Sequence, residues 1–193
     1  ADQQLDIPQT ALMGGSRKMH FDGIDDKVIT AASSDFDLPL SDFTFSAWMN
    51  AHADNEDAWT GVGIGSVGYQ VGAHLTPNRF LSYTTGGAAV DVEFTPATTN
   101  GVWNHLVATH DISEKVVRIY VNGALDVTSS AYSNNLDDGW DNKAFIGLGT
   151  GSRFFKGMID EFSIWNAKLS LAEIQELYND GIPLDANTHS KAG

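Results

Sequence analysis

Residues 116–128 read VVRIYVNGALDVT, and the pair Asn122-Gly123 divides this stretch into two runs with strand-like alternation. Asparagine and glycine both tolerate a positive φ angle, so this pair between two such runs favours a two-residue hairpin turn. The stretch therefore predicts two antiparallel strands, 116–121 and 124–128, joined by a tight turn.

Strand patterns of the same kind recur on both sides of this hairpin. Every second residue from Phe43 to Met49 is apolar, which indicates a strand with one face in the core. The run 102–110 is apolar on both faces, so we expect it to be a central strand. About a dozen such runs, separated by turn residues, predict an all-β fold, an antiparallel two-sheet β-sandwich.

One short C-terminal helix completes the predicted fold. Ser170 and Glu173 have the spacing of a capping box, in which each side chain accepts a hydrogen bond from the backbone of the other residue. Ile174 and Leu177 then share an apolar face, and Gly181 follows the expected end of the helix.

Length and composition set the broad class of protein. The 193 residues are predicted to form one domain, 1–193, with a core at 19–180 and peripheral segments at 1–18 and 185–193. The absence of cysteine excludes disulfides and thiol chemistry. A net charge of −14 disfavours nucleic acids as partners. No apolar run approaches the ~20 residues of a membrane span, so membrane insertion is not expected. Residues 1–4 suit the start of a mature chain, so we expect a secreted or cell-surface protein.

The stretch 21–26, FDGIDD, carries three carboxylates within five residues, those of Asp22, Asp25 and Asp26. Two explanations fit this pattern. Aspartate and glycine favour a solvated turn for backbone reasons alone. A hard cation, above all calcium, would instead neutralise carboxylates packed this closely.

A fourth carboxylate lies in the last strong strand pattern, 157–165. By alternation, Asp160 shares an inward row with Met158, Phe162 and Ile164. A buried ionised carboxylate is costly without a partner. If this strand pairs with the strand that begins at Met19, Asp160 comes close to the acidic stretch 21–26, and the four carboxylates together need a cation. The alternative is a solvated position for Asp160 at the mouth of the strand.

Seven segments of the chain carry a family resemblance: 19–26, 43–48, 103–108, 118–123, 145–147, 155–162 and 169–174. In this order they resemble the laminin G type 3 group of the concanavalin A-like lectin and glucanase domains. The resemblance implies a jelly roll of two curved antiparallel sheets. It also implies a structural calcium ion where the first and last strands meet, with Asp22, Asp25 or Asp26, and Asp160 as side-chain ligands.

Two tryptophans, Trp59 and Trp140, lie outside these segments in polar acidic loops. An indole in such a loop suits stacking on a sugar ring, with carboxylate and amide neighbours to accept hydrogen bonds from hydroxyl groups. The alternative is that each indole folds back as a loop anchor. Three further candidates, Tyr69, Arg79 and Tyr83, either line the expected concave sheet or lie on the surface of a strand. The candidate ligand-binding residues are Trp59, Trp140, Asp54, Asn55, Glu56, Asp138, Asp141, Asn142, Tyr69, Arg79 and Tyr83.

Glycosidase chemistry needs paired carboxylates on one face of a strand. Asp91 and Glu93 form such a pair, but the third carboxylate of the glucanase strand motif is absent. We therefore expect a non-catalytic carbohydrate-binding module, stabilised by calcium, that binds a polysaccharide or oligosaccharide and belongs to a larger protein with other domains. Two alternatives remain open. One is an adhesion or spacer domain that binds protein, and the other is a glycoside hydrolase or polysaccharide lyase.

Overall fold

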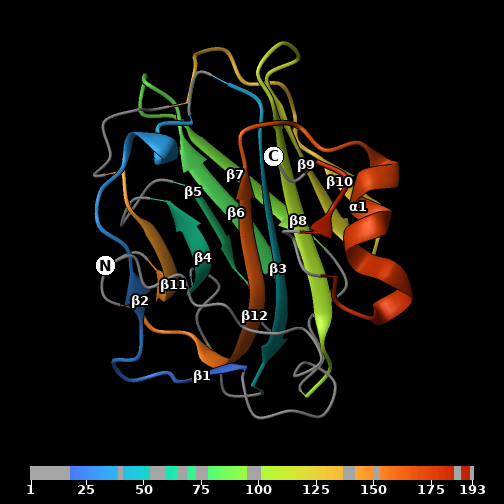
Figure 1. Cartoon of the computed structure of the whole chain (residues 1–193). Helices are drawn as coiled ribbons and strands as arrows, with labels where there is room; N and C mark the ends of the chain where they lie inside the picture. The colour runs from blue at the N-terminus through green and yellow to red at the C-terminus, as the bar shows by residue number, and fades with distance from the viewer. Residues whose placement is uncertain are drawn as a thin grey trace.

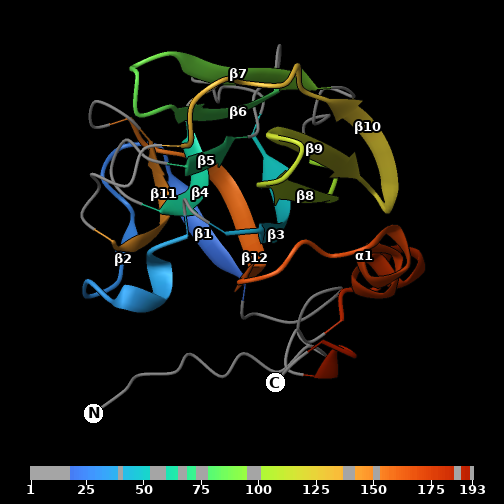
Figure 2. The same cartoon turned by 90° about the horizontal axis from the view of Figure 1, so that it is seen from above.

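The computed structural model of the chain contains two six-stranded antiparallel sheets packed face to face (Figures 1 and 2). Sheet A has the strand order β1-β12-β3-β8-β9-β10, and sheet B has the order β2-β11-β4-β5-β6-β7. This arrangement confirms the predicted antiparallel sandwich. The structure describes residues 18–38, 41–52, 60–64, 69–72, 78–94, 101–136, 142–149, 153–184 and 188–191.

Sheet A contains the strongest strand patterns of the sequence. Its central strands, β3 and β8, are buried along their whole length. The apolar run 102–110 predicted this central position for β8. The predicted hairpin joins β9 to β10, and Asn122 (φ 50°) and Gly123 (φ 76°) both adopt the positive φ angles that this turn requires. The strands are β1 (Met19–Asp22), β12 (Lys156–Trp165), β3 (Phe43–Ala51), β8 (Asn104–Asp111), β9 (Val116–Val121) and β10 (Ala124–Thr128).

Sheet B is built from shorter strands, and its edge strand β7 alternates between exposed and buried residues from end to end. Two single-turn 3-10 helices, η2 (Ser34–Phe36) and η3 (Asn179–Gly181), lie outside the sheets. The strands are β2 (Val28–Ile29), β11 (Ala144–Gly149), β4 (Thr60–Ile64), β5 (Tyr69–Gly72), β6 (Asn78–Tyr83) and β7 (Ala89–Phe94).

The helix α1 (Leu171–Tyr178) begins with the predicted capping box, in which Ser170 and Glu173 exchange hydrogen bonds. It covers the outer face of sheet A, beside β9 and β10 in Figure 1. Ile174 and Leu177 pack there against a small apolar cluster that includes Val107 of β8. The main core lies between the two sheets and contains Phe45, Phe80, Phe155, Leu106 and Ile159, all fully buried.

A β-bulge interrupts the strand β12. Asp160 lies opposite Trp48 and Ser163 lies opposite Ser46, so two residues of β12 face one residue of β3 between these pairs. Glu161 adopts a positive φ of 48° at this point. The extra residue reverses the alternation: Ile159 faces the core before the bulge, and Phe162 packs against the core after it.

The predicted inward row through Asp160 is therefore wrong. Residues directly opposite each other in an antiparallel pair share a face, and Trp48 faces outward, where its ring stacks on Tyr178 of α1. Asp160 accordingly lies on the outer face of sheet A. It is nevertheless buried, with 1% of its surface exposed, so the alternative of a solvated position is also excluded.

Candidate functional site

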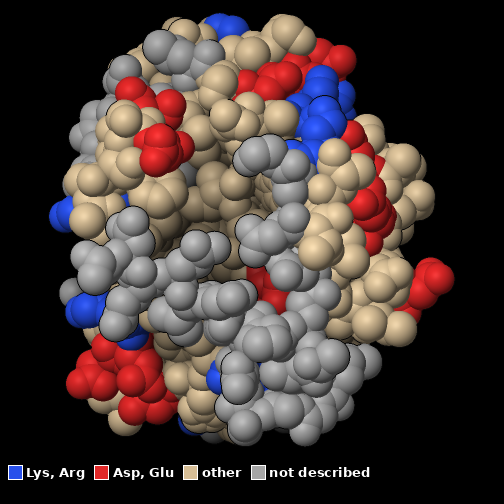
Figure 3. All heavy atoms as spheres, in the orientation of Figure 1, with Lys and Arg blue, Asp and Glu red and all other residues tan. Residues whose placement is uncertain are grey.

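The acidic turn after β1 brings three carboxylates together. One oxygen from each of Asp22, Asp25 and Asp26 lies within 4.8 Å of the others, and all three residues are exposed. Figure 3 shows Asp and Glu side chains gathered at the lower left of the molecule, over the end of β1. The turn is also held by its own carboxylates: the Asp22 amide donates to Asp26 Oδ2 (3.1 Å), and the Ile24 amide donates to Asp22 Oδ1 (2.7 Å).

Asp160 lies apart from these three residues. The first and last strands pair as predicted, but the register places Asp22 opposite Lys156 and Met19 opposite Ile159. Asp160 therefore lies beyond the other end of β1. The expectation of one site with four carboxylates is replaced by two separate positions, one at the exposed turn and one at Asp160.

The carboxylate of Asp160 is incompletely satisfied. Its Oδ1 accepts a hydrogen bond from the Glu161 amide (2.9 Å), whereas its buried Oδ2 has no hydrogen-bond partner among the described residues. Burial raises the pKa of Asp160, and the Glu161 amide and the charge of Lys18 counteract only part of this effect. Carboxylate oxygens are the preferred ligands of hard cations. Both the turn and this orphaned oxygen are therefore chemically suited to calcium.

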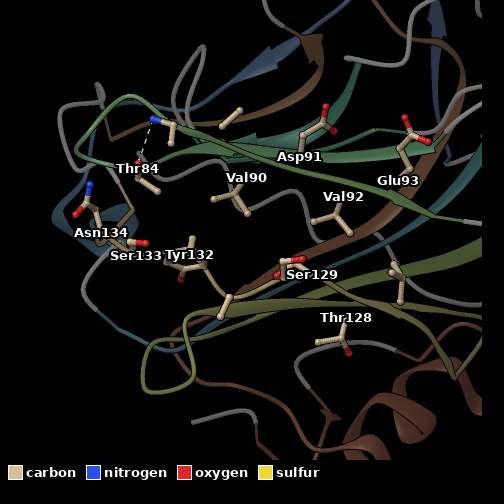
Figure 4. Close-up of a pocket in the computed structure, with 15 residues that line it drawn as sticks. Thr84, Val90, Asp91, Val92, Glu93, Thr128, Ser129, Tyr132, Ser133 and Asn134 are labelled. Carbon is tan, nitrogen blue, oxygen red and sulfur yellow. Dashed lines mark hydrogen bonds between the residues drawn. The ribbon is translucent and has the colours of Figure 1, made fainter.

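A groove with a volume of about 520 Å³ lies at the side of the sandwich, between β7 and the segment 127–134, which comprises the end of β10 and the residues after it (Figure 4). Both β7 and β10 are the last strands of their sheets, so the groove separates two sheet edges. In Figure 4, Val90 and Val92 point from β7 toward the segment 127–134. Asp91 and Glu93 point away from it, on the other side of β7. The groove thus has an apolar floor and a polar rim.

The segment 127–134 is fixed on its far side by the strand β9. The Ser129 amide donates to the Val117 carbonyl (2.8 Å), and the Tyr132 amide donates to the Lys115 carbonyl (3.1 Å). The Val117 amide in turn donates to Ser129 Oγ (2.9 Å). These bonds hold the segment in place beside the groove, whose lining includes residues with hydroxyl and amide side chains. The polar lining residues of this kind are Thr84, Thr128, Ser129, Ser130, Ser133 and Asn134.

Tyr132 is the aromatic residue of the groove wall, and a buried histidine positions it. Its ring stacks on His110 at a centroid distance of 6.0 Å, and the His110 ring stacks on Phe43 at 4.7 Å. Burial lowers the pKa of His110, which keeps the imidazole neutral. Since Nδ1 lies 2.8 Å from the Ser41 carbonyl, which can only accept, Nδ1 carries the proton. Nε2 is then the acceptor for the Tyr132 hydroxyl.

The carboxylates on the rim share one guanidinium. Arg79 of β6 forms ion pairs with both Asp91 and Glu93. The three side chains together carry a net charge of −1. Their carboxylates can accept hydrogen bonds from a ligand, and the arginine holds both of them on one side of β7.

The other predicted ligand residues are only partly placed. Arg79 reaches the groove rim, while Tyr83 lies on the same strand opposite Ala89 and outside the groove lining. The Asn142 carbonyl accepts a hydrogen bond from the Ser33 amide (2.9 Å), away from the groove residues. The side chain of Tyr69 lies outside the described part of the chain. So do Trp59, Trp140, Asp54, Asn55, Glu56, Asp138 and Asp141.

A family model described as the concanavalin A-like lectin/glucanases superfamily, laminin G type 3, matches residues 22–175. The chain belongs to this family. The match begins at Asp22, the last residue of β1, and ends within α1, so it covers the strands β2 to β12 and the groove of this laminin G type 3 domain. No curated protein sequence matches the domain.

Solved structures similar to the laminin G type 3 domain include those of several bacterial toxins. The binding domain of Paraclostridial Mosquitocidal Protein 1 has 15% identity and a TM-score of 0.64, with 86% of this chain and 47% of that chain covered. Another similar structure is that of botulinum neurotoxin type C, whose entry into cells depends on interaction with two ganglioside molecules. It has 18% identity and a TM-score of 0.63, with 82% of this chain and 42% of that chain covered. The binding domain of botulinum neurotoxin DC in complex with rat synaptotagmin II has 17% identity and a TM-score of 0.59, with 79% and 39% covered.

These similarities show a shared fold, and the laminin G type 3 domain spans less than half of each of those chains. Among the described residues, no helix is both long enough and apolar enough to cross a membrane.

Proposed function

We propose that this laminin G type 3 domain is a non-catalytic carbohydrate-binding module. The groove between β7 and the segment 127–134 is the observation that carries the proposal. Its volume of about 520 Å³ lies in the range of ligand pockets. It combines an apolar floor, a positioned tyrosine and a rim of hydroxyl, amide and carboxylate groups, and sugars present apolar ring faces together with many hydroxyl groups.

The carboxylate pair on β7 supports binding rather than hydrolysis. A glycosidase needs one carboxyl group to act as acid and a second to act as base or nucleophile, on either side of the scissile bond. Asp91 and Glu93 instead share the Arg79 guanidinium on one side of the strand. The similar solved structures are also described as binding domains, which favours recognition over catalysis.

A second candidate function is adhesion to a protein, because one similar structure is a complex with a protein receptor. In either case we place the domain in a larger protein that is secreted or carried on the cell surface. Within that protein, the domain would recognise glycans.

We also propose a structural calcium ion. Either the carboxylates of Asp22, Asp25 and Asp26 or the buried carboxylate of Asp160 would hold it. The ion would supply positive charge against these carboxylates and would stabilise the domain, because a ligand that binds only the folded state shifts the folding equilibrium.

A glycan array tests the function, with the domain applied first in calcium and then in EDTA. We expect binding to one or a few glycan classes, together with a fall in melting temperature in EDTA. Failure to bind any glycan in calcium would contradict the proposal, and capture of a protein receptor under the same conditions would favour the adhesion function.

A further inference from the structure

We infer that the groove between β7 and the segment 127–134 is the glycan site of this domain and that it selects uncharged glycans over acidic ones. The inference rests on the proposed carbohydrate-binding function and names its location and ligand class.

The charge of the groove carries the selectivity. Among the described lining residues, the charged ones are Asp91 and Glu93, and no lysine, arginine or histidine lines the groove. Arg79 approaches from the neighbouring strand and balances one of the two carboxylates, which leaves a net charge of −1 at the rim. A uronate or sulfate group would meet this charge with no cationic side chain among the described lining residues, and like charges placed together oppose binding.

Hydroxyl groups of a neutral sugar fit the same lining. A serine hydroxyl both donates and accepts, an asparagine amide does the same through separate atoms, and a carboxylate accepts. Ser129, Ser133 and Asn134 line the wall formed by the segment 127–134, and the carboxylates of Asp91 and Glu93 lie at the rim, on the other side of β7. A polyhydroxylated chain in the groove could therefore hydrogen-bond to this wall and, where it reaches the rim, to the carboxylates.

Tyr132 provides the apolar contact. The stack with His110 and the bond between its hydroxyl and His110 fix the ring before any ligand arrives. A ring that is already ordered loses little conformational entropy on binding, and this favours affinity. Tyr132 is thus the binding residue, and His110, which is fully buried, is a positioning residue.

The location is tested with Tyr132→Ala. Tyr178→Ala is the matched control, because Tyr178 is also a half-buried tyrosine stacked on a buried histidine, His105, but it belongs to α1 and lies outside the groove lining. Isothermal titration with the best neutral oligosaccharide from an array should show an affinity loss of at least about tenfold for the first variant and no change for the second. Equal affinities of the wild type and Tyr132→Ala would place the glycan site elsewhere and overturn the inference, while glycan binding itself would stand.

The selectivity is tested with matched oligosaccharide pairs that differ only in oxidation at C6, such as oligomers of galactose and galacturonate or of mannose and mannuronate. We expect the wild type to bind neutral members only. The double variant Asp91→Asn/Glu93→Gln should reduce its preference for the neutral member by about an order of magnitude. Glu114→Gln is the control, since it breaks a comparable pair with Arg118 on a different part of the surface.

Equal binding of both members of a pair by the wild type would overturn the selectivity and leave the carbohydrate-binding function intact. An absence of binding to every neutral and acidic glycan would overturn the proposed function itself.

Discussion

Asp160 lies directly opposite Trp48 in the β12–β3 pair, so the two side chains share the outer face of sheet A. The bulge at Glu161 creates this relationship by reversing the alternation of β12. It leaves a carboxylate oxygen buried without a partner among the described residues, beside an indole that stacks on His105. Asp160 thereby becomes the position at which a cation would most affect stability.

We expect Asp160→Asn to remove the rise in melting temperature that the proposed calcium ion would produce. In EDTA the same variant should be more stable than the wild type, by roughly 1–3 kcal/mol, because a neutral amide replaces an incompletely paired buried charge. Thermal unfolding of both proteins in calcium and in EDTA provides the measurement.

The control for this prediction is Asp25→Asn/Asp26→Asn in the exposed turn. Exposed carboxylates are already solvated, so their loss should change the melting temperature in EDTA only slightly. If this variant abolished the calcium response while Asp160→Asn retained it, the ion would belong to the turn, and the prediction would be wrong.

The β12 strand shows why alternation alone misplaced Asp160. The hairpin at Asn122-Gly123 and the capping box at Ser170 could be predicted because each depends on a few neighbouring residues with special backbone preferences. The bulge is set by the partner strand β3, and Glu161 has no local sequence signature for a positive φ. The pairing of the first and last strands was predicted correctly, but its register was not available from either strand alone.

His105 should make the folded state sensitive to mild acid. Burial lowers the pKa of His105 to about 3, from an ordinary value near 6.5. The unfolded chain therefore binds a proton in this pH range that the folded chain does not bind, and stability falls as the pH falls from about 6.5 toward 3. Burial lowers the pKa of His110 as well, which acts in the same direction.

The measurement is the free energy of unfolding in urea between about pH 7 and pH 5, where most carboxylates stay ionised. One differentially bound proton gives a slope of up to about 1.4 kcal/mol per pH unit. His105→Phe, which keeps a ring in contact with Trp48 and Tyr178, should show a smaller slope than the wild type. The exposed His20 is the control, and an unchanged slope in His105→Phe would contradict the assignment.

Gly147 should not tolerate a side chain. Its φ is +80°, and a Cβ atom there would lie 2.3 Å from the ring of Phe21 on β1. Backbone strain and overpacking add, so we expect Gly147→Ala to destabilise the domain by roughly 2–5 kcal/mol. Denaturant titration gives the value directly.

A substitution at Gly87 separates the cost of backbone strain from the cost of overpacking. The φ of this glycine, +78°, is nearly the same, but a Cβ atom there would meet nothing within 4 Å. Gly87→Ala should therefore cost only the backbone strain, about 1–2 kcal/mol. Equal losses at the two glycines would mean that Phe21 moves aside freely and that the contact between β11 and β1 contributes little to stability.

The groove could not be predicted because its two walls are more than 30 residues apart in the sequence and meet only at the edges of different sheets. Tyr132 lies in a polar stretch without a strand pattern, whereas its amide donates to the Lys115 carbonyl beside the edge of sheet A. Arg79 was predicted as a ligand residue, and the structure places it behind the rim carboxylates that it holds. An aromatic residue within a serine- and asparagine-rich run was the available sequence signal.

The pair of His110 and Tyr132 should be energetically coupled. His110→Phe preserves a ring between Phe43 and Tyr132 but removes the acceptor of the tyrosine hydroxyl and the donor to the Ser41 carbonyl. Buried polar groups left without partners cost about 1–3 kcal/mol each, so this variant should be clearly less stable than the wild type. Tyr132→Phe removes the hydroxyl and leaves the His110 acceptor unsatisfied.

A double-mutant cycle in urea measures the coupling. Once the histidine acceptor is gone, removal of the hydroxyl should cost little or should even restore stability, so the double variant should lose less than the sum of the single losses, by about 0.5–3 kcal/mol. Glycan affinity should be reduced less by Tyr132→Phe than by His110→Phe. Tyr132→Phe keeps a stacked ring in the groove wall, whereas His110→Phe loosens that ring. Additive stability losses would show that the hydroxyl and the imidazole act independently, and His110 would then have no part in positioning the tyrosine.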